Sequence, residues 1–199
     1  SNAVASLSVS NCTLTAPVVF GVSDNFGTIK AANVTFFPTP LNWRSQPNQS
    51  SGFLRPAPWP NAVNAWIGSN VIFENCKAVR RESTDVAAVI FEKGSMIGNL
   101  EFDGFVVQQA GFTDPATALL NLGSGSISQF VLNSVDSSHI DAPVERGEFV
   151  GIGTVAGTGV LATGWRFPDN VMAEGVPYIS ATTGQPSIKI GGIVQSYSP

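Results

Sequence analysis

A short phrase recurs about seven times along the chain, and it constrains the fold more than any other feature. Each copy opens with a branched apolar residue, continues with small or polar residues, and ends in an apolar and polar alternation. The clearest copies begin at Val4, Ile67, Ile97 and Ile127, and weaker ones begin at Ile29, Val160 and Ile188. Self-similarity at a period of about 20 to 50 residues indicates a stacked repeat, and repeat units made of strands indicate a β-solenoid.

The alternation predicts which side chains face the core. Alignment of the copies places apolar residues in two columns, Leu7, Val34, Val71, Leu100, Phe130 and Trp165 in the first, and Val9, Phe36, Phe73, Phe102, Leu132 and Phe167 in the second. A slip of one residue would bring Glu101 and Arg166 into the core, so the pattern argues for this register. Small or amide residues follow where we expect the chain to bend, at Asn11, Asn75, Gly104 and Ser134.

Helical periodicity is nearly absent, and short strand-like runs such as 17–22, 86–91, 118–122 and 149–152 precede copies of the phrase. Parallel strands need long return connections, and a solenoid supplies one in each coil. We therefore predict an all-β fold, a single-stranded right-handed parallel β-helix (β-solenoid) of about six to seven coils.

In segments such as NVIFENCKAV and NLEFDGFVV, a predicted strand ends at Asn or Gly, and an apolar residue follows directly. In this the chain resembles the pectin-lyase-like superfamily of right-handed parallel β-helices, from Val4 to about Tyr197. That group includes pectate lyases, polygalacturonase-like hydrolases and trimeric phage tailspikes. The resemblance implies a tailspike-like or secreted polysaccharide-acting protein, located outside the cell or on a virion surface.

The catalytic motifs of those relatives are not found here. The chain lacks the Asn-Thr-Asp strand, Asp-Asp pair, Gly-His-Gly turn and Arg-Ile-Lys strand of the hydrolases, and no Asp cluster beside an Arg resembles the lyase site. Whether the protein is an enzyme is therefore left open, and an active one would be a polysaccharide hydrolase or lyase. No cofactor or metal site is predicted, and calcium, although compatible with the resemblance, is not indicated by any residue cluster.

The repeat runs through 4–199 without a linker-like change in composition, so we expect one domain there. Residues 1–3, Ser-Asn-Ala, resemble the remnant of a removed tag, and a domain that begins within a repeat is expected to be a fragment of a longer protein. A loop rich in Pro and Trp occupies 38–66, where the density of proline argues against a regular strand or helix.

Charge and hydropathy exclude two classes of partner. With a net charge of -4 and no basic stripe, the chain is not expected to bind nucleic acid. No apolar run reaches the roughly 18 residues of a membrane span, so membrane insertion is not expected either. Cys12 and Cys76 occupy similar places two coils apart, beyond the reach of a disulfide, and are predicted to be free thiols.

The best catalytic candidates are carboxylates. Glu101 and Asp103 point outward on one predicted strand, and Glu74 takes the place of Asp103 on the strand before. Stacking would bring Glu74 and Asp103 to about 4.8 Å between Cα atoms, close to the spacing of a retaining glycosidase pair. The alternative is an ordinary solvated face on which Lys77 or a cation relieves the repulsion.

The best ligand-binding candidates lie in the Pro/Trp-rich loop. Trp43 and Trp59 offer flat apolar faces, and Arg44 and Arg55 offer planar donors, a combination that suits sugar rings. The tryptophans could equally anchor the loop to the body of the protein. His139, the single histidine, lies in a polar loop between Asp136 and Asp141 and reads as a surface residue.

The leading functional hypothesis is a carbohydrate-facing β-helix module that binds a polysaccharide or oligosaccharide. The first alternative is a glycan hydrolase or lyase using the outward carboxylates Glu74, Asp103 and Glu101. The second is a non-catalytic structural stalk of a trimeric fibre, a homotrimer that the outward apolar residues Ile72 and Val131 would favour.

Overall fold

A computed structural model describes residues 4–16, 18–22, 26–38, 52–56, 66–80, 89–90, 96–109, 118–122, 125–144 and 148–198. Within these ranges the protein is all-β. The helical elements there are two short 3-10 helices, η2 (Leu161–Thr163) and η3 (Asp169–Val171), and no α-helix is present. The all-β prediction is therefore confirmed.

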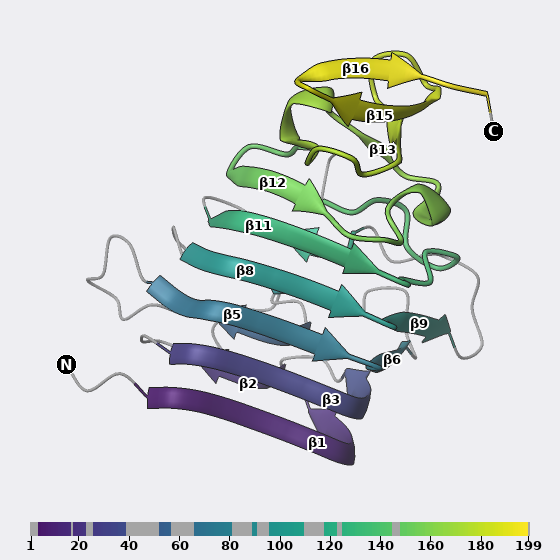
Figure 1. Ribbon diagram of the computed structural model, residues 1–199. Coiled ribbons are helices and arrows are strands. Elements are labelled where there is room, and N and C mark those ends of the chain that lie inside the picture. Colours follow the sequence, from purple (N-terminus) through teal and green to yellow (C-terminus); the bar gives the residue numbers. More distant parts are fainter. Residues whose placement is uncertain are drawn as a thin grey trace.

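Eight strands form the main sheet, and every pairing within it is parallel. The strands are β1 (Val4–Ala16), β3 (Phe26–Pro38), β5 (Trp66–Glu74), β6 (Lys77–Arg80), β8 (Met96–Asp103), β9 (Val106–Gln109), β11 (Ser126–Asn133) and β12 (Ile152–Ala156). Six of them are neighbours in the order in which they occur in the chain, β1-β3-β5-β8-β11-β12. Strand β6 pairs with the second half of β3, and β9 pairs with β6. Figure 1 shows the sheet curling into an open half-barrel.

The sheet bends along a line of residues in the left-handed backbone conformation. Asn11, Asn33, Asn75, Gly104 and Ser134 have φ values of 52°, 54°, 48°, 65° and 55°. Asparagine tolerates this conformation better than most residues, and glycine has no Cβ to clash. Asn33 Nδ2 also donates a hydrogen bond to Asn11 Oδ1 at 3.0 Å. The four bend positions expected from sequence are confirmed, and Asn33 is added to them.

Four shorter strands lie behind the main sheet in Figure 1. They are β2 (Val18–Val22), β4 (Gly52–Pro56), β7 (Val89–Ile90) and β10 (Leu120–Asn121), and they form two separate parallel pairs, β2–β4 and β7–β10. Strand β4 lies inside the segment 38–66, so the expectation that proline excludes a regular strand there is wrong over Gly52–Pro56.

The C-terminal part forms a small mixed sheet. It contains β13 (Arg166–Phe167), β14 (Tyr178–Ser180), β15 (Pro186–Ile190) and β16 (Ile193–Ser196), in that order. Strands β13 and β14 are parallel, whereas β14, β15 and β16 are antiparallel. Gly191 and Gly192, with φ of 58° and 77°, make the two-residue hairpin turn between β15 and β16.

The predicted right-handed parallel β-helix of six to seven coils is wrong, and so is the resemblance to the pectin-lyase-like superfamily and its tailspikes. A β-helix needs a continuous parallel sheet on each face of its coils. Here one sheet curls into a half-barrel with its strands hydrogen-bonded side by side, while the strands behind it form only two-stranded pieces within the described ranges. The final predicted copy, at Ile188, belongs to an antiparallel hairpin instead.

The core lies against the inward face of the curled sheet. Its first inward column is Leu7, Ile29, Val71, Leu100, Phe130 and Val155, and its second is Val9, Ala31, Phe73, Phe102 and Leu132. Phe102 packs at its centre, with ring centroids 5.1 Å from Phe73, 5.0 Å from Phe105 and 6.1 Å from Phe130. The predicted columns are correct over β5, β8 and β11. They are wrong at Val34, Phe36, Trp165 and Phe167, which are buried elsewhere in the core.

Candidate functional site

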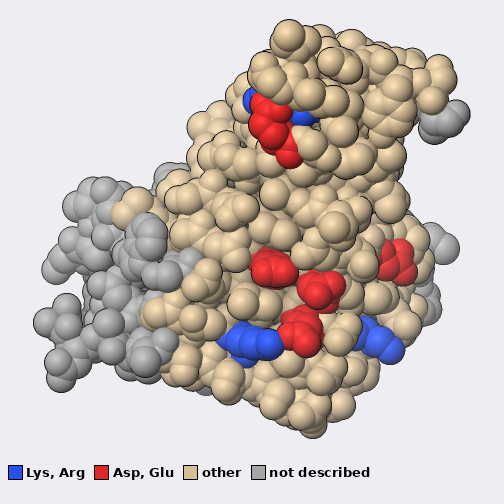
Figure 2. All heavy atoms as spheres, in the orientation of Figure 1, with Lys and Arg blue, Asp and Glu red and all other residues tan. Residues whose placement is uncertain are grey.

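Three carboxylates come together on the outward face of the main sheet. Glu74 ends β5, and its register partner on β8 is Asp103. Glu101 lies two residues before Asp103 and therefore on the same face of β8. Figure 2 shows acidic side chains gathered in the middle of this face, with basic side chains on either side. We call Glu74, Glu101 and Asp103 the acidic cluster; the predicted adjacency of Glu74 and Asp103 is present.

An ion pair partly neutralises the acidic cluster. Lys30 Nζ of β3 lies 2.5 Å from Glu74 Oε2, with 41% of the Lys30 side chain and 39% of the Glu74 side chain exposed. The hydrogen bond to Glu74 and the charge of that carboxylate raise the pKa of Lys30 above its usual range. The counter-charge is thus Lys30, from the strand before β5, rather than the Lys77 expected to relieve the repulsion.

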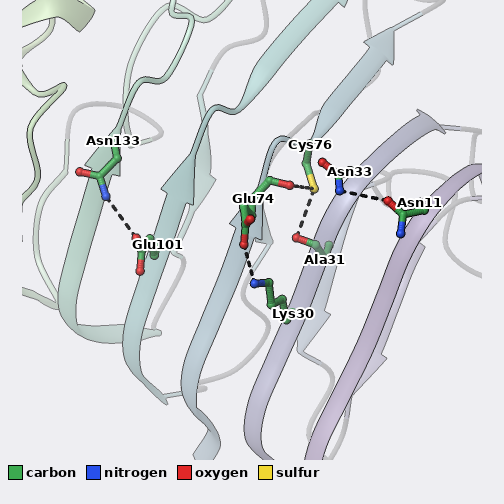
Figure 3. A network of polar contacts seen from close by, with 8 residues as sticks. All are labelled: Asn11, Lys30, Ala31, Asn33, Glu74, Cys76, Glu101 and Asn133. Atoms are coloured by element: carbon green, nitrogen blue, oxygen red, sulfur yellow. Dashed lines mark hydrogen bonds and ion pairs between the residues drawn. The ribbon is translucent and has the colours of Figure 1, made fainter.

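An amide holds the second carboxylate. Asn133 Nδ2, at the end of β11, donates to Glu101 Oε1 at 3.1 Å. Asn133 Oδ1 in turn accepts from the Thr158 backbone N–H at 3.0 Å and lies 3.2 Å from Thr158 Oγ1. Figure 3 shows how Lys30 and Asn133 approach the cluster from strands on its two sides. Each contact fixes one oxygen as an acceptor, so Glu74 and Glu101 are both held in place.

Asp103 is the third carboxylate of the acidic cluster. Among the described contacts its side chain has no hydrogen bond or ion pair, and it is half-buried rather than enclosed. Its register partners are Glu74 on β5 and Asn133 on β11. An acceptor flanked by positioned polar side chains suits a hydroxyl or amide donor.

A row of uncharged polar residues runs across the same face, beside the acidic cluster. In register order it contains Ser6, Thr28, Asn70, Asn99, Gln129 and Thr154. We call it the polar row. Ser6, Asn70 and Gln129 are exposed and the others are half-buried. Neighbouring members are about 4.8 Å apart because they stand on adjacent strands, so the row offers repeated donors and acceptors along the sheet.

The acidic cluster does not form a metal centre. Within the described ranges, no three His, Cys, Asp or Glu side chains are grouped so that they could hold a metal ion. The calcium dependence considered from sequence thus gains no support from these residues.

The other predicted binding residues fall largely outside the described ranges. Trp43, Arg44 and Trp59 lie outside the described residues. The backbone of Arg55 belongs to β4, where it pairs with Gly21 of β2, and its side chain is outside the description. These four residues remain predicted ligand contacts.

The remaining sequence candidates are the two cysteines and the loop around His139. Cys12 and Cys76 are free thiols, as predicted. Burial raises the pKa of Cys76, whose Sγ lies 3.4 Å from the carbonyl oxygen of Glu74 and 3.5 Å from that of Ala31, on the inner side of the sheet (Figure 3). Beside His139, hydrogen bonds from Ser138 lower the pKa of Asp136 and close a local turn.

Sequence reasoning missed two residues of the site, Lys30 and Asn133. Lys30 and Asn133 lie one strand away from their carboxylate partners and two residues off in register, a diagonal relation that only the correct strand pairing reveals. Arg80, at the end of β6, is buried, with 1% of its surface exposed. Arg80 lies two residues after the buried Ala78, so the alternation of inward and outward residues along β6 predicts that Arg80 points inward.

No helix in the described part of the chain is long and apolar enough to cross a membrane. A comparison with protein-family models found no match, and comparisons with curated proteins and with solved structures found none either.

Proposed function

We propose that the chain binds a polysaccharide of low charge on the outward face of its main sheet. The observation that carries this proposal is the polar row, six hydroxyl and amide side chains in register on neighbouring strands beside the acidic cluster. An extended, hydroxyl-rich polymer can exchange hydrogen bonds with several members of such a row at once. Many weak bonds to one chain add through effective concentration, so modest single contacts suffice.

The charge of the face sets the class of polymer. The acidic cluster contains three carboxylates, and one of them forms an ion pair with Lys30, so this region is net negative. It disfavours uronic-acid polymers and nucleic acid, which would place like charges side by side. Neutral polysaccharides avoid this repulsion, and Asp103 would accept a hydrogen bond from a sugar hydroxyl. A ligand of this class would place the protein outside the cell.

Calorimetric titration with neutral and acidic polysaccharides tests the proposal. We expect binding to the neutral class, weakened about tenfold by Asp103→Ala and about fivefold by Asn70→Ala. Gln195→Ala on β16 is the matched control, because it removes an exposed amide far from the polar row. The same titration of Trp43→Ala and Trp59→Ala examines the predicted loop contacts. Unchanged affinity in both Asp103→Ala and Asn70→Ala would refute binding on this face.

A second candidate function, hydrolysis or elimination of a glycan, is favoured by one observation. Glu74 and Asp103 are register partners on adjacent strands, which places their Cα atoms about 4.8 Å apart. Carboxyl groups about 5 to 5.5 Å apart act as acid and nucleophile in retaining glycosidases. However, the ion pair with Lys30 gives Glu74 a structural partner. Release of reducing ends or unsaturated products, abolished in Glu74→Gln, would establish catalysis; turnover unaffected by Glu74→Gln would exclude this pair.

A further inference from the structure

The outermost strand of the main sheet has an unprotected edge. Strand β1 pairs with β3, and no other described strand lies on its outer side (Figure 1). It is 13 residues long and contains no charged residue and no proline. Soluble proteins usually protect such an edge with lysine, proline, a bulge or a very short strand, because its free N–H and C=O groups can pair with another chain.

The core is also open beneath this edge. The inward residues of β1, Leu7, Val9, Cys12 and Leu14, are only partly buried. Their register partners on β3, Ile29, Ala31, Val34 and Phe36, are 0%, 0%, 1% and 0% exposed. The inward side chains are therefore fully buried on β3 but partly exposed to solvent on β1. Another strand alongside β1 would bury them.

The inward pattern of β1 is symmetric about its centre. Asn11, with φ of 52°, shifts the alternation by one residue, so the apolar positions are 7 and 9 before it and 12 and 14 after it. These positions are mirrored about the midpoint between Ser10 and Asn11. Two copies of β1 placed antiparallel about that midpoint would set Leu7 opposite Leu14 of the second copy and Val9 opposite Cys12 of the second copy. Hydroxyl residues such as Ser8 and Thr13 would face each other on the outside.

The far end of the main sheet does not offer a matching edge. Val155 of β12 forms a parallel bridge with Met172, and its carbonyl oxygen accepts from the Ala173 N–H at 2.9 Å. A head-to-tail contact of β1 with β12 of another copy would have to displace this segment. A self-complementary patch instead suits a two-fold interface, in which each copy uses the same surface.

We propose that two copies of this chain associate through β1, antiparallel about a two-fold axis between Ser10 and Asn11, so that their main sheets become one continuous sheet. Backbone hydrogen bonds and the four inward apolar residues of each copy form the contact. No charge opposes it, since β1 carries none.

Sedimentation and thiol cross-linking of the full chain test this dimer. We expect a dimer in sedimentation, converted to a monomer of unchanged circular dichroism by Ser10→Asp, which brings two carboxylates together at the axis. Gln129→Asp adds the same charge to the exposed face of β11 and should leave the dimer intact. A monomer or a trimer of the unaltered chain would overturn the proposal.

Cross-linking tests the register independently. In Val9→Cys the new thiol lies opposite Cys12 of the second copy, and oxidation should yield a covalent dimer. Val9→Cys combined with Cys12→Ser removes the partner thiol and should abolish the cross-link. Ser8→Cys, which faces outward and meets Thr13 of the second copy, should not cross-link to Cys12. A covalent dimer in Ser8→Cys but not in Val9→Cys would contradict the proposed register.

Discussion

The two ends of the main sheet are built differently. At the β12 end, the C-terminal segment covers the core with Trp165, Phe167, Met172 and Tyr178, which are 7%, 0%, 2% and 0% exposed. At the β1 end, the equivalent apolar residues are only partly buried. Regular strand pairing therefore extends a core but does not close it. Closure at the C-terminal end is achieved by a segment that departs from the repeated pattern.

The closed end also satisfies its buried polar groups. Tyr178 donates its hydroxyl to Asp169 Oδ1 at 2.8 Å, and Trp165 Nε1 donates to the carbonyl oxygen of Ile140 at 3.2 Å. Buried hydroxyl and indole groups without such partners would cost stability. At the β1 end the outward groups are serine and threonine hydroxyls in contact with solvent, which need no internal partner.

The largest difference between the ends is expected from large-to-small substitutions. Phe167→Ala at the closed end should lower the free energy of unfolding by about 3 to 5 kcal/mol, because it leaves a cavity in a fully buried site. Leu7→Ala at the open end should cost only about 1 kcal/mol, because that side chain is already partly in water. Urea denaturation measures both. Equal losses at the two sites would show that the β1 end is as well covered as the other.

A glycine at the closed end gives the next largest effect. Gly157 has φ of 123°, and a Cβ there would lie 2.2 Å from the carbonyl oxygen of Leu132. Gly157→Ala should therefore destabilise by more than about 2 kcal/mol. Gly175→Ala is the matched control, with φ of 74° and open space around the new Cβ, and should cost about 1 kcal/mol. Similar losses in the two variants would mean that backbone strain alone, and not close packing on β11, decides the effect.

The buried hydroxyl of the closed end predicts a pH dependence. Burial, followed by the hydrogen bond to Asp169, raises the pKa of Tyr178 well above its usual value. The resulting stabilisation is present below about pH 10, where the unfolded tyrosine is also protonated, and is lost as the pH rises towards the folded pKa. Tyr178→Phe should lower stability by about 1 kcal/mol at neutral pH and flatten this alkaline decline. A decline that persists in Tyr178→Phe would assign it to other groups.

Asp169, the hydrogen-bond partner of Tyr178, predicts a pH dependence of stability in acid. Desolvation alone would raise its pKa, but hydrogen bonds from Ser180, Tyr178 and Thr182 lower the pKa of Asp169 below its usual range. A lowered pKa stabilises the fold above about pH 4, and this contribution is lost as the pH falls through the folded pKa. Denaturation of Asp169→Asn should show a weaker loss of stability in acid than the unaltered chain. An identical acid profile would exclude this contribution.

The smallest effect is expected at the exposed ion pair, which lies nearer the open end. Lys30→Gln removes the ion-pair partner of Glu74 and makes the region of the acidic cluster more negative. Exposed pairs contribute little because solvent and salt screen them. We expect a slight loss of stability at about 0.01 M salt that disappears at about 1 M salt. A large loss that persisted at high salt would mean that Lys30 acts through packing.

Sequence reasoning succeeded where the alternation is regular. The inward columns are correct over Val71, Leu100 and Phe130, and the same register places Asp103 beside Glu74. On β8 the outward positions next to the inward columns are Glu101 and Asp103, and burying these charges would be costly, so one register is strongly preferred. The bends at Asn75 and Gly104 were also visible, because only a few residue types accept the left-handed conformation.

The prediction failed where two registers are equally apolar. On β3, both Ile29 and Val34 point inward because the bend at Asn33 shifts the alternation, and the sequence alone did not distinguish them. The final segment carried a clearer signal that was overlooked. Gly191 and Gly192 between alternating residues are typical of a two-residue hairpin, which a parallel solenoid coil cannot contain. Whether the strands behind the main sheet join into one continuous sheet depends on long-range strand pairing, which local sequence patterns do not encode.

Strands β1, β3, β5, β8, β11 and β12 are neighbours in space in the order in which they occur in the chain. During synthesis, each new strand can therefore pair with the one made just before it, and none has to wait for a distant partner. Until the C-terminal segment leaves the ribosome, however, every nascent intermediate exposes the unpaired edge of its last strand, which can pair with another chain. A ribosome that stalls before Trp165 would release a product with this edge exposed, and we expect such truncated chains to aggregate more readily than the complete protein.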